Sequence, residues 1–159
     1  VFKTPTDNRT DYIKRLIGLP GDELQIINGD LYLNDNKISG SKIEIILNIH
    51  CGNEIMDSEL YEETLPNGKK YTSAYRKQGR MKNTDKFIVP EDHYFFMGDN
   101  RDCSKDSRFL SSVGYVNFVN FVGKAQIIFF SNDVKKGGFF KFWKWNKSIR
   151  LDRFLKKIK

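Results

Sequence analysis

Short apolar runs separated by turn-forming residues recur along most of this chain. Glu23–Ile27 and Leu31–Leu33 flank Asn28-Gly29, a pair that favours a two-residue β-hairpin turn. Asn67-Gly68 marks a second turn of this kind, and Ile43–Ile49 is rich in β-branched residues. Apolar runs of this length, bounded by turn residues, are typical of strands. The sequence therefore predicts a mostly β protein.

Composition divides the chain into a core and an insertion. The stretch from about residue 50 to 85 is more polar than its surroundings, so we expect residues 36–85 to form an inserted smaller β subdomain. The main β core would then be discontinuous, over residues 1–35 and 86–134. Gly123–Ser131 contains Gln-Ile-Ile-Phe-Phe and is predicted to close this core as a strand.

Basic charge is concentrated in the C-terminal tail, residues 135–159. The chain has a net charge of +7, but the tail holds ten Lys and Arg against one acid, and residues 1–134 hold seventeen against nineteen. Its lysines alternate with Phe139, Phe140, Phe142, Trp143 and Trp145. This pattern favours binding to a membrane surface, with packing on the core as the alternative; no nucleic-acid motif accompanies it. A short basic helix is predicted from the helical spacing of Leu151, Phe154, Leu155 and Ile158.

Several classes of site and segment are not indicated by the sequence. No run of 18 apolar residues occurs, so we expect no membrane-spanning helix within these residues. Cys51 and Cys103 follow no metal-ligand spacing, and we expect two free thiols, with a single disulfide as the alternative. His50 and His93 are isolated and are expected to be surface or packing residues. We therefore predict no metal and no cofactor.

One lysine lies inside an apolar run. Tyr12–Ile17 is a predicted strand in which Ile13, Leu16 and Ile17 are the apolar neighbours of Lys14. A free lysine has a pKa of about 10.4 and is protonated at neutral pH. Burial disfavours the ammonium form and lowers that pKa. A neutral Lys14 could take a proton from a serine or a water; the alternative is a strand lysine that points to solvent.

A charged loop follows a later apolar run, in the segment Met97-Gly-Asp-Asn-Arg-Asp-Cys-Ser-Lys-Asp-Ser-Arg108. Ser104 could accept a hydrogen bond from the Lys14 amine and orient it. The loop would be held rigid by pairing among Asp99, Arg101, Asp106 and Arg108. The alternative is a salt-bridged turn that takes no part in catalysis.

These two segments resemble the motifs of one family. Tyr12-Ile-Lys-Arg-Leu-Ile-Gly-Leu-Pro-Gly-Asp22 is similar to the lysine box of bacterial signal peptidase I, the leader peptidases with a Ser–Lys dyad. Met97–Arg108 resembles that family's Gly-Asp-Asn-Arg-Asp-Asn-Ser-x-Asp-Ser-Arg box, with Cys103 in place of the second Asn. Val1–Pro5, Leu65–Gly68 and Gly123–Ala125 also fit their usual places. The resemblance covers essentially the whole chain and implies a signal-peptidase-like β core.

The resemblance implies a catalytic role for two residues and a structural role for four. Lys14 would be the general base that deprotonates a serine nucleophile, and Ser104 would orient the lysine amine. The loop would be supported by an ion pair of Asp106 with Arg108, and by Asp99 with Arg101. The family uses neither a metal nor a nucleotide.

The resemblance also implies a substrate and a location. Val1, Tyr12 and Ile13 would line shallow apolar pockets that admit only the small side chains of Ala-x-Ala cleavage sites. The partners would be the signal peptides of exported preproteins, and also the membrane surface, through the tail. The catalytic domain would lie on the outer, periplasmic face of the cytoplasmic membrane.

One family motif is absent. The nucleophilic serine of the family belongs to a Ser-Met-x-Pro-Thr motif that precedes the strand beginning here at Val1, and these 159 residues do not contain it. The chain therefore reads as a fragment of a longer protein, and we expect it not to cleave signal peptides by itself. The alternatives are a self-cleaving repressor-type Ser–Lys peptidase and a non-catalytic remnant or binding module of the same fold.

Overall fold

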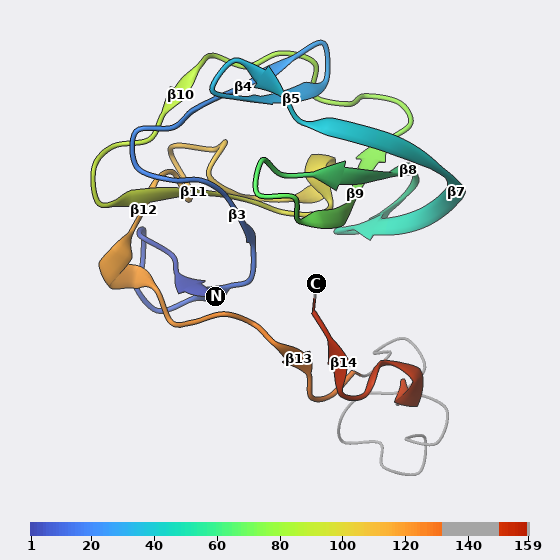
Figure 1. Cartoon of the computed structure of the whole chain (residues 1–159). Coiled ribbons are helices and arrows are strands. Elements are labelled where there is room, and N and C mark those ends of the chain that lie inside the picture. Colours follow the sequence, from blue (N-terminus) through green and yellow to red (C-terminus); the bar gives the residue numbers. More distant parts are fainter. Residues whose placement is uncertain (132–149, 159) are drawn as a thin grey trace. The chain divides into compact units, whose positions relative to one another are not determined.

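The computed structural model describes residues 1–131 and 150–158, which are mostly strands and turns (Figure 1). The chain forms two compact units, Val1–Gly123 and Lys124–Lys159. The prediction of a mostly β protein is confirmed. All of the predicted site residues belong to the first unit.

One sheet of the first unit is built around the predicted Asn-Gly hairpin. Strands β4 (Glu23–Ile27) and β5 (Asp30–Leu33) pair with Ile27 opposite Asp30, so two residues make the turn. Asn28 and Gly29 both have positive φ angles, as a turn that matches the strand twist requires. β10 (Phe87–Ile88) pairs with β4, and β6 (Asn36–Lys37) pairs with β5.

The strands that carry the candidate site form two small sheets of the first unit. β3 (Arg15–Gly18) pairs with β11 (His93–Met97), which also pairs with β12 (Val116–Asn117). β1 (Phe2–Lys3) pairs with β2 (Asp11–Tyr12). Two short 3-10 turns follow β11 in sequence, η1 (Arg101–Cys103) and η2 (Phe118–Asn120).

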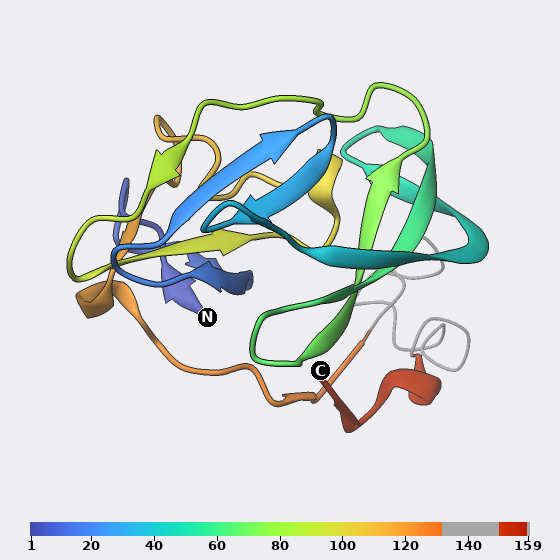
Figure 2. The ribbon, with the colours of Figure 1, turned by 45° about the horizontal axis from the view of Figure 1, so that its top comes forward.

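The third sheet comes from the middle of the chain. β7 (Ser39–Cys51), β8 (Glu54–Thr64) and β9 (Lys70–Arg76) form an antiparallel sheet, which we call the inserted sheet. The long β7–β8 hairpin extends to one side of the first unit in both views (Figures 1 and 2). Because β6 pairs with β5, we propose that the insertion begins at β7 rather than at residue 36.

Two groups of buried apolar side chains form the core of the first unit. The larger group packs between the β4–β5 hairpin and β11, and contains Ile17, Leu24, Ile26, Leu31, Leu33, Ile38, Tyr71, Phe87, Val89, Phe95 and Met97. The smaller group joins β1 to the other face of β11, and contains Phe2, Phe96, Val113 and Val116. Phe95 and Phe96 face opposite groups because successive side chains of a strand alternate. The lysine segment and the charged loop therefore flank a strand that is packed on both faces.

Two predictions about the C-terminal end are wrong. Gly123–Ser131 is not one strand: only Ile127–Ile128 forms a strand (β13), and it pairs with β14 (Lys156–Lys157). The predicted helix is instead a 3-10 turn, η4 (Leu151–Arg153), followed by β14. An isolated helix this short is marginal in water without a packed face, and Leu151 is 75% exposed. The predicted tail aromatics, residues 139–145, lie outside the described residues.

Candidate active site

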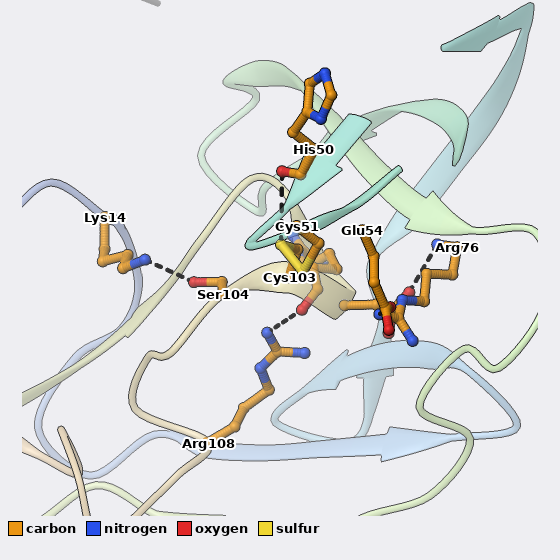
Figure 3. The surroundings of a disulfide bond; sticks show 10 residues. Lys14, His50, Cys51, Glu54, Arg76, Cys103, Ser104 and Arg108 are labelled. Atoms are coloured by element: carbon orange, nitrogen blue, oxygen red, sulfur yellow. Dashed lines mark hydrogen bonds and ion pairs between the residues drawn. A yellow bond between two sulfur atoms is a disulfide. The ribbon is translucent and has the colours of Figure 1, made fainter. Parts of the chain in front are cut away.

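Lys14 lies in the break between β2 and β3, and not within a continuous strand as the sequence suggested. Its Nζ donates a hydrogen bond of 2.7 Å to Ser104 Oγ, across 90 residues of sequence. Figure 3 shows the two side chains pointing toward each other from separate segments. Lys14 is half-buried, and its Nζ also lies 5.4 Å from the ring centre of Tyr12. The fold thus brings together the lysine and the serine that the sequence singled out.

The surroundings of Lys14 favour its neutral form. Burial lowers the pKa of the Lys14 amine below its ordinary value, and this effect outweighs the nearby carboxylates of Asp106 and Asp99, which raise it. The Arg108 guanidinium lowers the pKa further, by like-charge repulsion. The apolar neighbours predicted for this role are not all responsible, because Ile13 is 65% exposed. The amine is therefore easier to deprotonate than that of a surface lysine.

Ser104 is buried at the end of η1, within a tightly packed loop. A Cβ atom added to Gly98 would lie 2.1 Å from Ser104 Oγ and 3.5 Å from Lys14 Nζ. Only glycine leaves the space in which the two polar groups meet. The backbone N–H of Gly98 donates to the Asp106 carboxylate at 2.9 Å, which holds the two sides of the loop together.

The charged residues of the loop pair differently from the expectation. Asp106 and Arg108 form a buried ion pair at 2.8 Å. Asp99 and Arg101 do not pair with each other: Asp99 binds Arg15 at 2.7 Å, and Arg101 binds a carboxylate from β8 at 2.5 Å. Asp99 and Arg101 therefore each bind a partner that is distant in sequence, although their spacing equals that of Asp106 and Arg108.

The β8 partner of Arg101 is Glu63, which the sequence reasoning missed. It is buried, and three hydroxyl groups from β9 also bind its carboxylate: Tyr71, Ser73 and Tyr75. The alternation of these three hydroxyl residues was a usable signal, because positions i, i+2 and i+4 share one face of a strand. Their partner on β8 could not be chosen among several acidic residues without the strand register.

The expectation of two free thiols is wrong. Cys51 and Cys103 form a disulfide, with their Cα atoms 5.5 Å apart. The bond joins the end of β7 to η1, next to Ser104 (Figure 3). Sequence spacing could not reveal this, since the two residues are 52 positions apart and only the fold of the β7–β8 hairpin brings them together.

Of the three predicted substrate-contact residues, Tyr12 ends β2, Ile13 lies between Tyr12 and Lys14, and Val1 precedes β1. Phe2 pairs with Tyr12, so the β1 end that begins at Val1 lies beside β2. The Val1 ammonium donates to the Gly123 carbonyl at 2.7 Å. Tyr12 is partly buried and packs against Phe2, whereas Ile13 is exposed next to Lys14. An apolar surface is thus available beside the amine.

Lys14 and Ser104 together can supply a general base. The pKa of the Lys14 amine is lowered, and the Ser104 hydroxyl orients that amine. Across residues 1–131 and 150–158, no three His, Cys, Asp or Glu side chains gather in a way that could hold a metal ion. Within the same residues no helix has the length and apolar character needed to cross a membrane.

Comparison with known proteins gives concordant matches. The family model described as signal peptidase, peptidase S26, matches residues 1–130. Signal peptidase I of Rickettsia typhi (strain ATCC VR-144 / Wilmington) is 41% identical over 173 residues, covering 99% of this chain and 63% of the relative. The protein of the same name from Rickettsia prowazekii (strain Madrid E) gives the same values. The chain thus spans about 63% of the length of these relatives.

A solved structure is also similar. A signal peptidase I from Enterococcus faecalis V583 shares 28% identity with this chain and aligns with a TM-score of 0.43. The alignment covers 77% of this chain and 87% of that one.

Proposed function

This chain belongs to the signal peptidase family, peptidase S26, and from that membership we propose that it supplies the general base of a serine endopeptidase that removes signal peptides from exported proteins. The observation that carries the proposal is the 2.7 Å hydrogen bond between Lys14 Nζ and Ser104 Oγ. The family membership favours this reading over a self-cleaving repressor-type peptidase or a non-catalytic remnant.

The proposed reaction uses the neutral form of Lys14. Its amine takes the proton of a serine hydroxyl as that oxygen attacks the scissile carbonyl carbon. The resulting ammonium then gives the proton to the leaving amine, and an acyl-enzyme remains. In the second half of the reaction, Lys14 takes a proton from a water as its oxygen attacks the acyl carbon. The Lys14 ammonium returns this proton to the serine oxygen as the ester bond breaks, which regenerates both groups. Ser104 accepts a hydrogen bond from the Lys14 amine throughout the reaction. This bond directs the lone pair of the amine nitrogen toward the proton that it removes.

We propose that the nucleophilic serine is not among residues 1–159. The basis is the resemblance to the family, whose Ser-Met-x-Pro-Thr motif has no counterpart in this sequence. The hydroxyl bound to Lys14 belongs to Ser104, which is buried and packed against Gly98, so it suits an orienting role better than attack on a peptide. The relatives are longer than this chain.

We propose that small side chains of the substrate bind beside Lys14. Ile13 offers exposed apolar surface there, Tyr12 lies in β2, and Val1 directly precedes β1, which pairs with β2. Shallow apolar sites admit alanine and exclude larger side chains, which supports Ala-x-Ala specificity.

We propose that the catalytic part lies on the outer face of the cytoplasmic membrane. The Cys51–Cys103 disulfide supports this location, because disulfides persist in oxidising compartments. The basic and aromatic tail, residues 135–159, is proposed to bind the membrane surface.

Replacing Lys14 tests the proposed base. In the protein that carries this chain together with the serine segment, Lys14→Met should lower kcat/KM on an Ala-x-Ala peptide by roughly 100- to 10,000-fold, the usual contribution of a general base. Circular dichroism should show an unchanged fold. In the parent protein, kcat/KM should rise with pH through the lowered pKa of Lys14, because only the neutral amine acts as a base.

Two measurements accompany this test. Lys37→Met is the matched control, since Lys37 is exposed and pairs with Asp30 on the β5–β6 hairpin; its activity should equal that of the parent. Residues 1–159 alone should not hydrolyse the peptide. A fully active Lys14→Met variant would refute the proposed base, and turnover by residues 1–159 would refute the proposed location of the nucleophile.

A further inference from the structure

A buried polar cluster lies on one face of the inserted sheet, apart from the Lys14–Ser104 pair. Glu63 in β8 is directly opposite Tyr71 in β9, and Tyr71, Ser73 and Tyr75 share that face. Their hydroxyls donate to the Glu63 carboxylate at 2.6, 2.7 and 2.5 Å. Glu63 is only 4% exposed. A carboxylate so buried needs a compensating charge.

Arg101 supplies that charge from the charged loop. Its guanidinium donates to Glu63 at 2.5 Å, to Tyr75 at 2.7 Å and to Tyr71 at 2.8 Å. Burial opposes ionisation of Glu63, but Arg101 and the hydroxyl donors outweigh it and hold the pKa of that carboxyl below its ordinary value. Both members of the pair are therefore charged in the folded protein.

Arg101 is the first residue of η1, the turn that directly precedes Ser104. The side chains of all three η1 residues bind to the segment that contains the inserted sheet. Asp102 accepts two backbone N–H groups, one at the end of β9 at 2.8 Å and one shortly after it at 3.1 Å. Cys103 is joined to β7 by the disulfide. The inserted sheet therefore determines where η1 lies, and with it the position of Ser104.

We propose that Glu63 is a positioning residue: through Arg101 it holds η1 so that Ser104 meets Lys14. The consequence for catalysis rests on the proposed function, whereas the effect on the Lys14–Ser104 contact does not. The contact between Arg101 and Glu63 is a buried ion pair. Neutralising one partner of such a pair leaves the charge of the other buried and uncompensated.

Glu63→Gln should therefore change the surroundings of Lys14 without touching it. Arg101 would lose its counter-charge and move, Ser104 would withdraw from the amine, and water would reach Lys14. The charged groups that act on Lys14 are Asp106, Arg108 and Asp99, with the Tyr12 ring nearby. Better hydration raises the pKa of the amine, whereas direct loss of a negative charge would lower it. The sign of the change separates positioning from a direct charge effect.

The experiment is an NMR titration of the Lys14 side-chain Cε signal in residues 1–159. We expect its midpoint to move to higher pH in Glu63→Gln than in the parent chain. Glu62→Gln is the matched control, because Glu62 lies on the other face of β8 and pairs with Lys70; its midpoint should not change. This readout needs no catalysis, so the proposed function can fail while this inference stands.

Folding and activity complete the test. If Glu63→Gln does not fold, the double variant Glu63→Gln with Arg101→Met, which leaves no buried unpaired charge, is titrated instead and should show the same upward shift. In the active protein, Glu63→Gln should lower kcat up to roughly 100-fold, the cost of a displacement near 1 Å, with KM little changed. A folded variant with an unchanged or lowered Lys14 midpoint, or an equal shift in Glu62→Gln, would overturn the inference.

Discussion

Gly98 shows how one residue determines the contact between Lys14 and Ser104. The loop folds back so tightly that the space beside the Gly98 Cα is occupied by the Ser104 side chain. Interiors are close-packed, and an added methyl group in such a place forces neighbours to move. The resemblance to the family includes this glycine, but only the tertiary structure gives the reason for it.

Gly98→Ala should displace Ser104 from Lys14. The added Cβ would lie 2.1 Å from Ser104 Oγ and 2.5 Å from its Cβ. We expect kcat/KM to fall roughly 100-fold in the active protein, with a stability loss of about 1–3 kcal/mol. Gly68→Ala is the control, because its added Cβ would meet no atom within 4 Å, while its positive φ also costs stability without touching Ser104. Equal activity of Gly98→Ala and the parent would contradict the assigned role of Ser104.

At the scale of elements, the inserted sheet and the charged loop depend on each other. Ala74 in β9 donates its backbone N–H to the Asp99 carbonyl at 2.8 Å, and Arg15 in β3 binds the Asp99 carboxylate. Arg15 also lies over the Tyr71 ring, 4.2 Å from its centre. A segment that looked like an accessory insertion in the sequence thus forms one wall of the loop.

Reduction of the Cys51–Cys103 disulfide should destabilise the protein. The bond closes a loop that separates the two cysteines by 52 positions, and loops of this length correspond to about 4 kcal/mol in the chain-entropy model. Urea unfolding with and without a thiol reductant should show a lower midpoint in the reduced protein. The Cys51→Ser, Cys103→Ser double variant should match the reduced parent and be insensitive to reductant. Identical midpoints in all samples would show that the disulfide does not contribute.

At the scale of the whole molecule, the candidate site and the excess positive charge belong to different parts of the chain. The compact first unit, Val1–Gly123, contains every candidate site residue, whereas the basic excess belongs to residues 135–159. In the second unit, the described apolar side chains of Phe129, Leu151 and Phe154 are at least half exposed. Exposed apolar side chains in a unit that also carries the basic segment suit the boundary between water and an anionic bilayer.

Removing residues 139–159 should weaken membrane binding and leave the site intact. Each Lys or Arg near an anionic membrane contributes about 1 kcal/mol, and this segment holds most of the basic residues of the tail. We expect co-sedimentation of the chain with anionic lipid vesicles, and a large loss of it on truncation. Vesicles of zwitterionic lipid serve as the control and should bind less of the intact chain. Equal binding by the intact and truncated chains would refute the role of the tail.

The sequence alone determined the local structure and the identity of the central pair. Asn28-Gly29 is a hairpin turn because both positions need positive φ, which Asn and Gly tolerate, and this requirement is local. The resemblance of two segments was enough to select Lys14 and Ser104. The prediction of a C-terminal helix was wrong because apolar residues at helical spacing do not specify a helix when that face has no surface to pack on.

Only the tertiary structure decided the partners of the charged residues. Glu63 with Arg101, Arg15 with Asp99, and Cys51 with Cys103 are each far apart in sequence. Their pairing follows from the register of β8 with β9, from the pairing of β3 with β11, and from the path of the β7–β8 hairpin. A carboxylate or thiol in a sequence has many possible partners. A buried carboxylate needs a compensating charge and a disulfide needs two thiols at the right distance, and only the folded chain decides which groups are close enough.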